Sequence, residues 1–471
     1  MAGVPGCPGC KELKRVVREQ RKRIDFLERR LECQQRQIDA LAAALEGSRR
    51  AGKRQAAPFS KGKPKVEPKK PGRKPGKDYG KAERRAIPRQ VDEVLDAPLP
   101  HQCADCRGAV VEDRVEKQYQ TEIPPVKPLV RGFDVHVGHC ERCGKRFQGR
   151  HPQQTSDALG AAASQLGPRV VAFSAWFHQV LGLPYGKASD LLSEVYGIDV
   201  TPGGLAQAHA RLARRGGPAY DRVLDEIRQS AAVYPDETSA RMNGQRWWLW
   251  VFATTLATAY VQRPSRGFDV VEEILGKDFA GLLGHDGWAP YDKLTDATHQ
   301  QCLAHLIVRS KELLEIATRG AVRFPRKVKR LLQDALGLRD RWEAGALSEH
   351  GFRVARGKLE KRLERILAMH VTHEGNRKFQ NHLDKHADEI LTFLYEDVEA
   401  TNWRAEQAIR PSTRFRKTSG GHRSPRGART RDVLLTLFQT ARQRGLDPLP
   451  LLARMLHSHA KVVLIPTPAG S

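Results

Sequence analysis

The segment after Ala231 constrains the fold most, because its hydrophobic pattern changes along the chain in a definite order. Three strand-like stretches come first, followed by a helix-like stretch and a short apolar strand that ends in an acid at a glycine turn: 232–238, 246–255, 257–262, 269–275 and 281–288. Three antiparallel strands that lead into a helix and a parallel strand are typical of a ribonuclease-H-like sheet. In such a sheet, Asp236 on the first strand and Asp286 at the end of the fourth point at the same place.

Two converging aspartates suit phosphodiester chemistry with Mg²⁺. That chemistry needs several hard oxygen ligands around two ions about 3.5–4 Å apart. A third acid is therefore expected. The chain has 54 Asp and Glu residues, each by default a solvated surface charge, so spacing alone does not choose the third.

Composition limits the class of protein. A chain of 471 residues with 40% hydrophobic residues can build several domains, which excludes a disordered tail or a disulfide-stapled miniprotein. The 80 Lys and Arg exceed the 54 acids by 26, which favours a polyanionic partner, first of all nucleic acid; a ribosomal or membrane-surface protein would also fit the charge alone. The sequence lacks an apolar stretch of membrane-spanning length and a signal core, so we expect a cytoplasmic protein without a membrane partner.

The N-terminal segment carries a heptad pattern. Apolar residues recur at one seam position, and Leu alternates with Gln at the other: Cys10, Val17, Ile24, Leu31, Ile38 and Leu45, then Leu13, Gln20, Leu27, Gln34 and Leu41. This pattern predicts a coiled coil and a homo-oligomer, most simply a dimer. The alternative is a long helix that packs on its own chain.

A basic arm follows the heptads. Residues 49–89 contain 16 Lys and Arg against 3 acids, among many Pro and Gly, and cannot build a core. Its centre, residues 69–77 with Arg73 and Lys74, resembles an AT-hook, which enters the narrow minor groove of A·T tracts. A merely solvated linker is the alternative.

Two Cys-x-x-Cys pairs predict a structural Zn²⁺ site. Cys103 and Cys106 are separated from Cys140 and Cys143 by 33 residues. Four thiolates from two such turns make a closed tetrahedral site, and strand-like stretches at 110–115 and 130–137 suggest a zinc ribbon. Neighbouring histidines offer substitutes for one of the thiolates: His101 and His139. The pair Cys7 and Cys10 is weaker evidence for metal.

The region 153–215 has a helical pattern that ends in the outline of a helix-turn-helix. A helix over 185–196 stops at Gly197, and Thr201-Pro202 begins a second, basic helix through Arg215. In this motif the second helix lies in the major groove of DNA. Any two packed helices share the outline, so the motif remains one of two interpretations.

Several blocks of the chain resemble, in order, the DDE transposases of the insertion sequence sixty-six family. They are Tyr234-Pro235-Asp236-Glu237-Thr238, Asp286-Gly287-Trp288-x-x-Tyr291, Cys302-x-x-His305, residues 401–411 and the C-terminal stretches 416–421 and 440–448. The resemblance implies that Asp236, Asp286 and Glu406 are the catalytic triad and hold two Mg²⁺ (or Mn²⁺) ions. Cys302 and His305 would brace the sheet or contact DNA; a buried Cys and a capping His are the alternative.

The interval of 120 residues from Asp286 to Glu406 reads as a helical insertion. Apolar residues at three-and-four spacing predict helices over 307–319, 328–343, 348–369 and 377–395. After Glu406 the chain is rich in cations that would bind DNA phosphates, notably Arg410, Arg414, Arg416 and Lys417. Trp403 and Gln407 depart from the family's usual Asn and Arg at these positions.

The expected function is a transposase that cuts insertion-sequence ends and transfers them into double-stranded target DNA, near the bacterial nucleoid. A catalytically silent DNA-binding regulator and a nuclease that does not join strands are the alternatives, and small companion proteins commonly accompany the family. The expected organisation is multidomain α/β: coiled coil 1–48, basic linker 49–96, zinc ribbon 97–152, helix-turn-helix region 153–228, ribonuclease-H-like core 229–306 and 399–471, and all-helical insertion 307–398.

Overall fold

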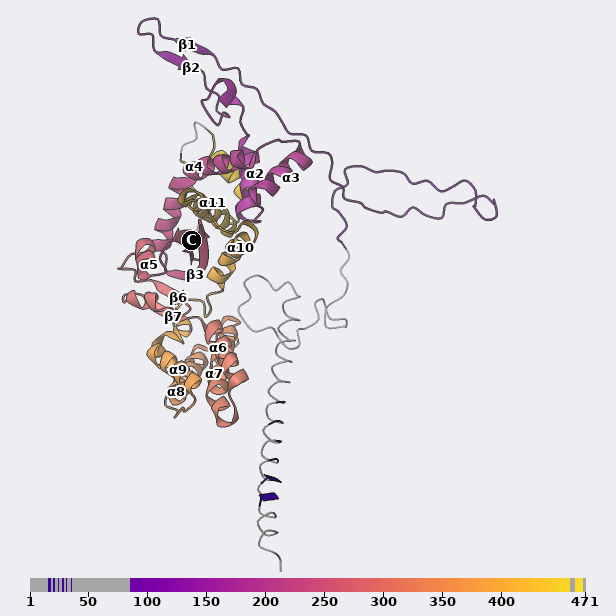
Figure 1. The fold of residues 1–471 in the computed structure, drawn as a ribbon. Helices are drawn as coiled ribbons and strands as arrows, with labels where there is room; N and C mark the ends of the chain where they lie inside the picture. The colour runs from indigo at the N-terminus through magenta and orange to yellow at the C-terminus, as the bar shows by residue number, and fades with distance from the viewer. Residues whose placement is uncertain are drawn as a thin grey trace, which may run out of the picture. The chain divides into compact units, whose positions relative to one another are not determined.

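The computed structural model describes residues 85–457 and 462–468, together with the N-terminal positions 16, 17, 20, 21, 24, 28, 31 and 35. By its internal contacts the chain divides into two compact units, Met1–Pro124 and Pro125–Ser471, and each is described by itself (Figure 1). No helix of the described residues is long and apolar enough to cross a membrane.

Part of the predicted coil falls on described positions. These positions are helical, and the seam residues Val17, Ile24 and Leu31 are exposed. The remaining coil positions and the centre of the basic arm, with Arg73 and Lys74, lie outside the described residues.

The first unit contains the turn around Cys103 and Cys106. The backbone N–H of Cys103 donates to the Gly108 carbonyl at 2.9 Å, and that of Arg107 donates to the Cys103 carbonyl at 3.0 Å. Backbone N–H groups of Cys106 and the residue before it donate to the Cys103 sulfur, which lowers the pKa of this thiol. The turn therefore favours a thiolate, the form that binds metal.

The second unit repeats this turn at Cys140 and Cys143. The backbone N–H of Cys140 donates to the Lys145 carbonyl at 2.9 Å, and that of Gly144 donates to the Cys140 carbonyl at 2.8 Å. Backbone N–H groups of Cys143 and its predecessor again lower the pKa of the first cysteine. The two pairs thus have the same hydrogen-bond pattern, one in each unit.

The strands next to these turns differ from the expectation. β1 (Val137–His139) and β2 (Arg146–Gln148) pair antiparallel on either side of the second turn. The described stretch 110–115 carries no strand, and only the last residue of 130–137 lies in one. Val111 and Val115 are both 79% exposed, so the alternation there has no buried face to stabilise a ladder.

The second unit is built around a five-stranded sheet. Its strand order is β5-β4-β3-β6-β7, with β3 (Ala232–Met242), β4 (Gln245–Ala253) and β5 (Thr258–Arg263) antiparallel, and β6 (Leu282–His285) and β7 (Thr298–Gln301) parallel to β3. α5 (Phe268–Leu275) connects β5 to β6. This is the order that the sequence predicts, with the addition of β7.

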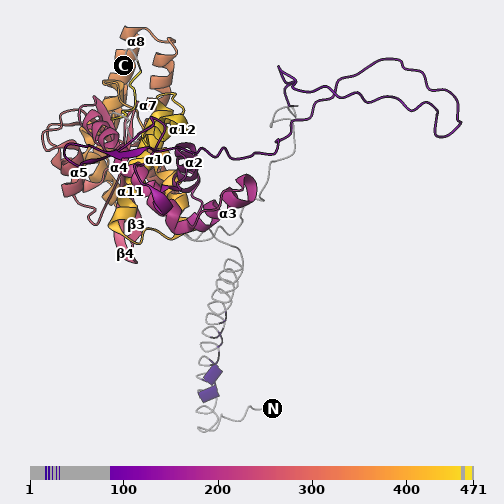
Figure 2. The same ribbon diagram turned by 90° about the horizontal axis from the view of Figure 1, so that it is seen from above.

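Helices cover both faces of the sheet. Trp250 and Phe252 on β4 point into one core, which α2 (Pro168–Gln179), α4 (Pro202–Arg228) and α11 (Pro425–Gln443) complete. The alternate residues of β4 point into the other core, beneath α10 (Trp403–Ser419). In Figure 2, α2, α4 and α11 lie together with α12 (Pro448–Arg454).

The expected helix-turn-helix segment is helical but extends further than predicted. α3 (Tyr185–Tyr196) ends at Gly197, whose φ is 62°, and Thr201 Oγ1 caps α4 by accepting from Gly204 N–H at 3.1 Å. α4 continues past Arg215 to residue 228, because its apolar stripe continues and packs on α11. The buried Gly216 lies so close to Leu437 of α11 that a Cβ there would stand 2.6 Å from the leucine side chain.

The predicted insertion is helical and lies next to β7 (Figure 1). Its helices are α6 (Leu303–Ile316), α7 (Arg323–Glu343), α8 (Glu349–Leu367) and α9 (Glu374–Lys385). The last expected helix, 377–395, ends earlier; its remainder forms two 3₁₀ turns, η5 (Ala387–Glu389) and η6 (Thr392–Leu394). These turns are fixed by contacts with β7, which override the helical spacing.

One edge of the sheet depends on α11. The backbone N–H groups of Thr258, Tyr260 and Gln262 on edge strand β5 point out of the sheet. They donate to Thr440 Oγ1, Thr436 Oγ1 and Asp432 Oδ2 at 3.2, 3.0 and 3.1 Å. The donors are two residues apart on the strand, and the acceptors are four residues apart on the helix. These two spacings cover nearly the same length, so each donor lies opposite an acceptor. α11 thereby satisfies the edge that would otherwise be open.

We expect Thr436→Val to destabilise the protein by about 1–3 kcal/mol, because the buried Tyr260 N–H loses its acceptor while the side chain keeps its shape. Urea unfolding measures the change. Thr430→Val in the same helix is the matched control, since Thr430 Oγ1 only donates to a carbonyl of its own helix. Equal losses in the two variants would contradict the role of α11 as the cover of this edge.

Candidate active site

The two sequence-predicted aspartates lie on neighbouring parallel strands at the same level. In the register of β3 and β6, Val233 is paired with Leu283, and three residues further along each strand stand Asp236 and Asp286. Asp236 lies within β3, and Asp286 is the first residue after β6. The structure thus brings together the two aspartates that the strand pattern selected.

The surroundings of Asp236 disfavour its charge. Burial, together with the neighbouring carboxylates of Glu237 and Asp286, raises the pKa of Asp236 from 3.8 to about 7. The only contact of Asp236 among the described hydrogen bonds comes from the Glu237 N–H at 2.9 Å. Half-buried carboxylates that crowd together are what a divalent cation with oxygen ligands relieves, so this part of the site fits Mg²⁺ or Mn²⁺.

Glu406 reaches the sheet on α10, and Asn402 docks this helix. Asn402 is 1% exposed; its Nδ2–H donates to the Pro235 carbonyl, next to Asp236, at 2.7 Å. Its backbone N–H donates to Cys302 Sγ at 3.2 Å, and its carbonyl accepts from the Glu406 N–H at 3.1 Å. One residue therefore connects the first acid, the third acid and the Cys-x-x-His segment.

Cys302 and His305 lie beside the third acid. Cys302 is the N-cap residue of α6, and His305 lies in the first turn of this helix. The ligand atoms of Cys302, His305 and Glu406 all lie within 4.8 Å of one another, and His305 Nδ1 is 3.8 Å from Glu406 Oε1. A hydrogen bond with Cys302 raises the pKa of His305 to about 9, with Glu406 and Asp286 acting in the same direction. His305 thus lies in electrostatic reach of the acids from all three elements.

Behind Asp236, a buried glutamate that the sequence reasoning missed ties β3 to the Asp286 loop. Glu237 Oε1 accepts from Arg266 at 2.6 and 2.9 Å, and its Oε2 accepts from Tyr291 Oη at 3.0 Å. The Arg266 guanidinium lies 3.8 Å from the Trp288 ring centre. Glu237 and Tyr291 both belong to the motifs that resemble the transposase family, so the sequence marked each of them. Their spacing in the sequence did not predict that they contact each other.

The expected DNA-binding cations of α10 fall on two sides of the helix. Arg410, Arg414 and Lys417 are exposed at three-and-four spacing, in line with Trp403 and Gln407. Arg416 instead turns to the sheet, where its guanidinium donates to the Ser239 carbonyl and to Ser239 Oγ. All four cations lie on α10. A further arginine of the following helix, Arg431 on α11, is 2% exposed and lies in the core, so it does not face solvent.

Each of the two predicted pairs of zinc ligands is suited to bind zinc when it is considered by itself. Each pair offers two thiols on a turn whose backbone N–H groups favour the thiolate. Cys103 and Cys106 belong to the first unit, and Cys140 and Cys143 to the second. The joint four-cysteine site therefore stays a prediction.

We expect Asp236→Asn to stabilise the Mg²⁺-free protein at pH 8 by a few degrees in Tm. An acid whose pKa is raised from 3.8 to about 7 adds stability when protonated, and this contribution is lost as the pH rises through about 7. The gain should therefore be smaller at pH 5. Thermal unfolding at both pH values measures it, with Asp334→Asn, an exposed acid of the insertion, as the control. An Asn variant that melts no higher than wild type at pH 8 would refute the crowding of charge.

Comparison with known proteins identifies the family of the chain. The sequence profile described as Transposase IS66 family matches residues 163–430, more than half of the chain, and the match includes Asp236, Asp286 and Glu406. The chain is also 25% identical over 402 residues to the uncharacterized protein y4qI of Sinorhizobium fredii (strain NBRC 101917 / NGR234), which covers 78% of this chain and 72% of that protein. The resemblance noted in the sequence is confirmed: this chain belongs to the Transposase IS66 family.

Proposed function

We propose that the chain is a DDE transposase that cleaves DNA at insertion-sequence ends and joins those ends to target DNA. The observation that carries the proposal is that Asp236 and Asp286 stand at one level of neighbouring strands, while α10, with Glu406 beside His305, is docked on the Asp236 strand through Asn402. Membership of a transposase family supports action on DNA. The order of the five strands supports a ribonuclease-H-like core.

Asp236, Asp286 and Glu406 would hold the metal ions. Two Mg²⁺ or Mn²⁺ ions bound there would supply activation of the attacking oxygen and stabilisation of the leaving oxygen. Glu237 keeps the Asp236 strand fixed to the loop after Asp286, and Asn402 keeps Glu406 fixed to the Asp236 strand. The chain itself therefore supplies a ligand set that is held in place before DNA arrives.

The proposed reaction has two displacements at phosphorus. In the first, a water oxygen bonds to the phosphorus at the element end, the bond from phosphorus to the element's 3′ oxygen breaks, and a free 3′-OH results. In the second, this 3′ oxygen bonds to a phosphorus of the target and displaces a target 3′ oxygen, which leaves as a hydroxyl. The phosphodiester count is conserved in the second step, and no covalent bond to the protein forms.

The exposed stripe of α10 would contact the DNA backbone. Arg410, Arg414 and Lys417 project from the helix that carries Glu406, so phosphates bound to them lie next to the acids. Arg416 would act indirectly, by holding α10 on β3. The exposed Trp403 at the start of the stripe offers an aromatic face beside Arg404, whose guanidinium is 4.7 Å from the ring centre.

The N-terminal regions would bind and pair the element ends. Exposed, helical Val17, Ile24 and Leu31 recur every seven residues, which supports a coiled-coil dimer; light scattering of the chain and of a Val17/Ile24/Leu31→Ser variant tests it. The α3–α4 pair remains the candidate helix-turn-helix, and Arg73 and Lys74 the candidate minor-groove contact. Loss of DNA binding on their replacement by Ala tests the latter two residues.

We infer a zinc ribbon from the two Cys-x-x-Cys turns, because both have the same backbone pattern and both favour a thiolate at the first cysteine. Structural zinc needs four such ligands. Bound there, it would fix the segment between the arm and the helical region.

We expect about one Zn²⁺ per chain, lost in Cys140→Ser and kept in Asp236→Asn, since four thiolates from two turns form one closed site. Elemental analysis of the purified proteins measures the metal. Full zinc content in Cys140→Ser would show that the two turns do not share an ion.

We expect the purified chain, with Mg²⁺ or Mn²⁺, to nick DNA that carries its own gene's flanking sequences and to join the cut end to a second DNA. Asp236→Asn, Asp286→Asn and Glu406→Gln should each lose about 100-fold or more, as loss of an electrostatic contact to the transition state does. Asp334→Asn should retain activity, because it lies on the surface of the insertion. Labelled DNA ends on denaturing gels measure both steps.

Each alternative has its own result in this assay. Nicking without joining would favour a ribonuclease-H-like nuclease. Tight binding of the flanking DNA without nicking would refute the claim that the chain suffices, and would favour a silent regulator or a requirement for companion proteins.

A further inference from the structure

The turn that carries Asp286 is shaped by its two neighbours. Gly287 has a φ of 86°, in the left-handed region, and its N–H donates to His285 Nδ1 at 3.1 Å. The Trp288 N–H donates to Asp286 Oδ1 at 3.0 Å. The direction of the Asp286 carboxylate is therefore set by the conformation of residues 285–288.

This turn is pressed against two other elements. A Cβ on Gly287 would stand 2.6 Å from Gln301 Oε1 and 3.1 Å from His382 Cε1. Gln301 belongs to β7, and His382 belongs to α9 of the insertion. The insertion thus packs directly against the Asp286 turn.

The ring of His285 is held by a chain of hydrogen bonds. Because Gly287 N–H donates to its Nδ1, that nitrogen is an acceptor and the ring proton lies on Nε2. Nε2–H then donates to His299 Nδ1 at 2.9 Å, and His299 Nε2–H donates to the Leu294 carbonyl at 2.9 Å. His285 is 0% exposed, so these bonds are shielded from bulk solvent.

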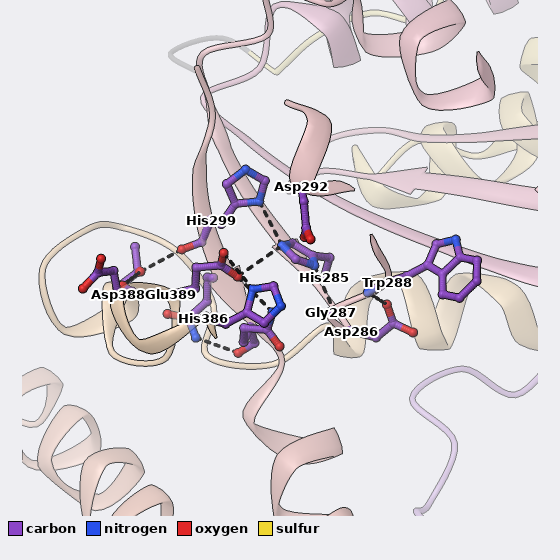
Figure 3. A network of polar contacts seen from close by, with 12 residues as sticks. His285, Asp286, Gly287, Trp288, Asp292, His299, His386, Asp388 and Glu389 are labelled. Carbon is purple, nitrogen blue, oxygen red and sulfur yellow. Dashed lines mark hydrogen bonds and ion pairs between the residues drawn. The ribbon is translucent and has the colours of Figure 1, made fainter. Parts of the chain in front are cut away.

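A single carboxylate from the insertion connects the residues around this turn (Figure 3). Glu389 Oε2 accepts from Gln301 Nε2–H at 2.9 Å and lies 3.9 Å from His285 Nε2. Its other oxygen is 3.0 Å from His386 Nδ1, at the end of α9. We call His285, His299, Gln301, His386 and Glu389 the insertion network.

Further contacts fix Glu389 against the sheet. Thr392 Oγ1–H donates to the His299 carbonyl at 2.7 Å, and the Phe393 N–H donates to Gln300 Oε1 at 2.6 Å. Lys385 at the end of α9 donates to Asp292 Oδ2 at 2.6 Å, in the 3₁₀ turn η3 (Ala289–Lys293) that follows Asp286. The 3₁₀ turns are thereby docked along β7, the second edge strand of the sheet.

We propose that the helical insertion is a working part of the active site and that Glu389 is a positioning residue for Asp286. Glu389 acts through Gln301 and His285, the two side chains that border the Asp286 turn, and does not itself touch DNA or metal. This inference rests on the proposed function, because it takes Asp286 as a ligand of the catalytic metal. A shift of α9 and η5 would move the carboxylate and weaken the metal site, so the insertion can control chemistry from a distance.

The test compares Glu389→Ala with Glu389→Gln in the full chain. The Ala variant removes both hydrogen bonds. In the Gln variant the amide oxygen can accept from Gln301, while the amide N–H donates to His386 Nδ1 in its other tautomer. We expect the Mg²⁺ concentration for half-maximal cleavage to rise on the order of 10-fold in Glu389→Ala, as for loss of an outer partner of a metal ligand, and to stay within about threefold of wild type in Glu389→Gln. Asp334→Asn, which breaks an ion pair between α7 and α8, is the matched control.

Mn²⁺ binding, followed by the electron paramagnetic resonance signal of free Mn²⁺, gives a second readout that needs no cleavage. If wild type and Asp286→Asn bind the same amount of Mn²⁺, or wild type binds none, the proposed function fails. If wild type binds more Mn²⁺ than Asp286→Asn and Glu389→Ala binds it as well as wild type, only the present inference fails. A Glu389→Gln variant as weak as Glu389→Ala, or an equal loss in Asp334→Asn, would also overturn it, because the effect would then not follow the two hydrogen bonds.

Discussion

The docking of α10 on β3 is the contact on which the candidate site depends, because Glu406, the proposed third acid, lies 120 residues beyond Asp286. Asn402 makes this contact specific: its side chain bonds the Pro235 carbonyl, its N–H bonds Cys302 Sγ, and its carbonyl begins the turn that presents Glu406. A buried amide fixes both distance and rotation of the helix, which apolar packing of Ala405 and Ala408 alone would leave less defined.

The same principle closes both edges of the sheet. β5 is satisfied by side-chain oxygens of α11, and β7 by the 3₁₀ turns of the insertion. Each of these covering segments is far from its strand in the sequence. α11 follows α10, which carries Glu406, and the 3₁₀ turn η5 carries Glu389, which bonds Gln301 beside the Asp286 turn. An exposed edge would be open to pairing with other chains, so the covers protect the fold and at the same time fix the geometry of the site.

The sequence predicted the parts of this arrangement that depend on a repeated local signal. Alternating apolar residues located β3, β4 and β5, and a glycine turn after an apolar strand located Asp286. β7 was missed because Thr298–Gln301 is polar and becomes a strand only through its parallel partner β6. The insertion network was missed for a related reason: Glu389 and His285 meet across 104 residues, and no periodicity links a single glutamate to a single histidine.

The positions of Trp403 and Gln407 on α10 explain how this helix tolerates two departures from the family pattern. Trp403 and Gln407 lie on the exposed side of α10, together with Arg410 and Arg414, whereas the docking side carries Asn402 and the buried alanines. A change on the exposed side leaves the helix in the same place on β3, because none of the docking contacts involves it. In the proposed function, the altered residues would therefore change what α10 presents to DNA, while the position of Glu406 is set independently by the buried face.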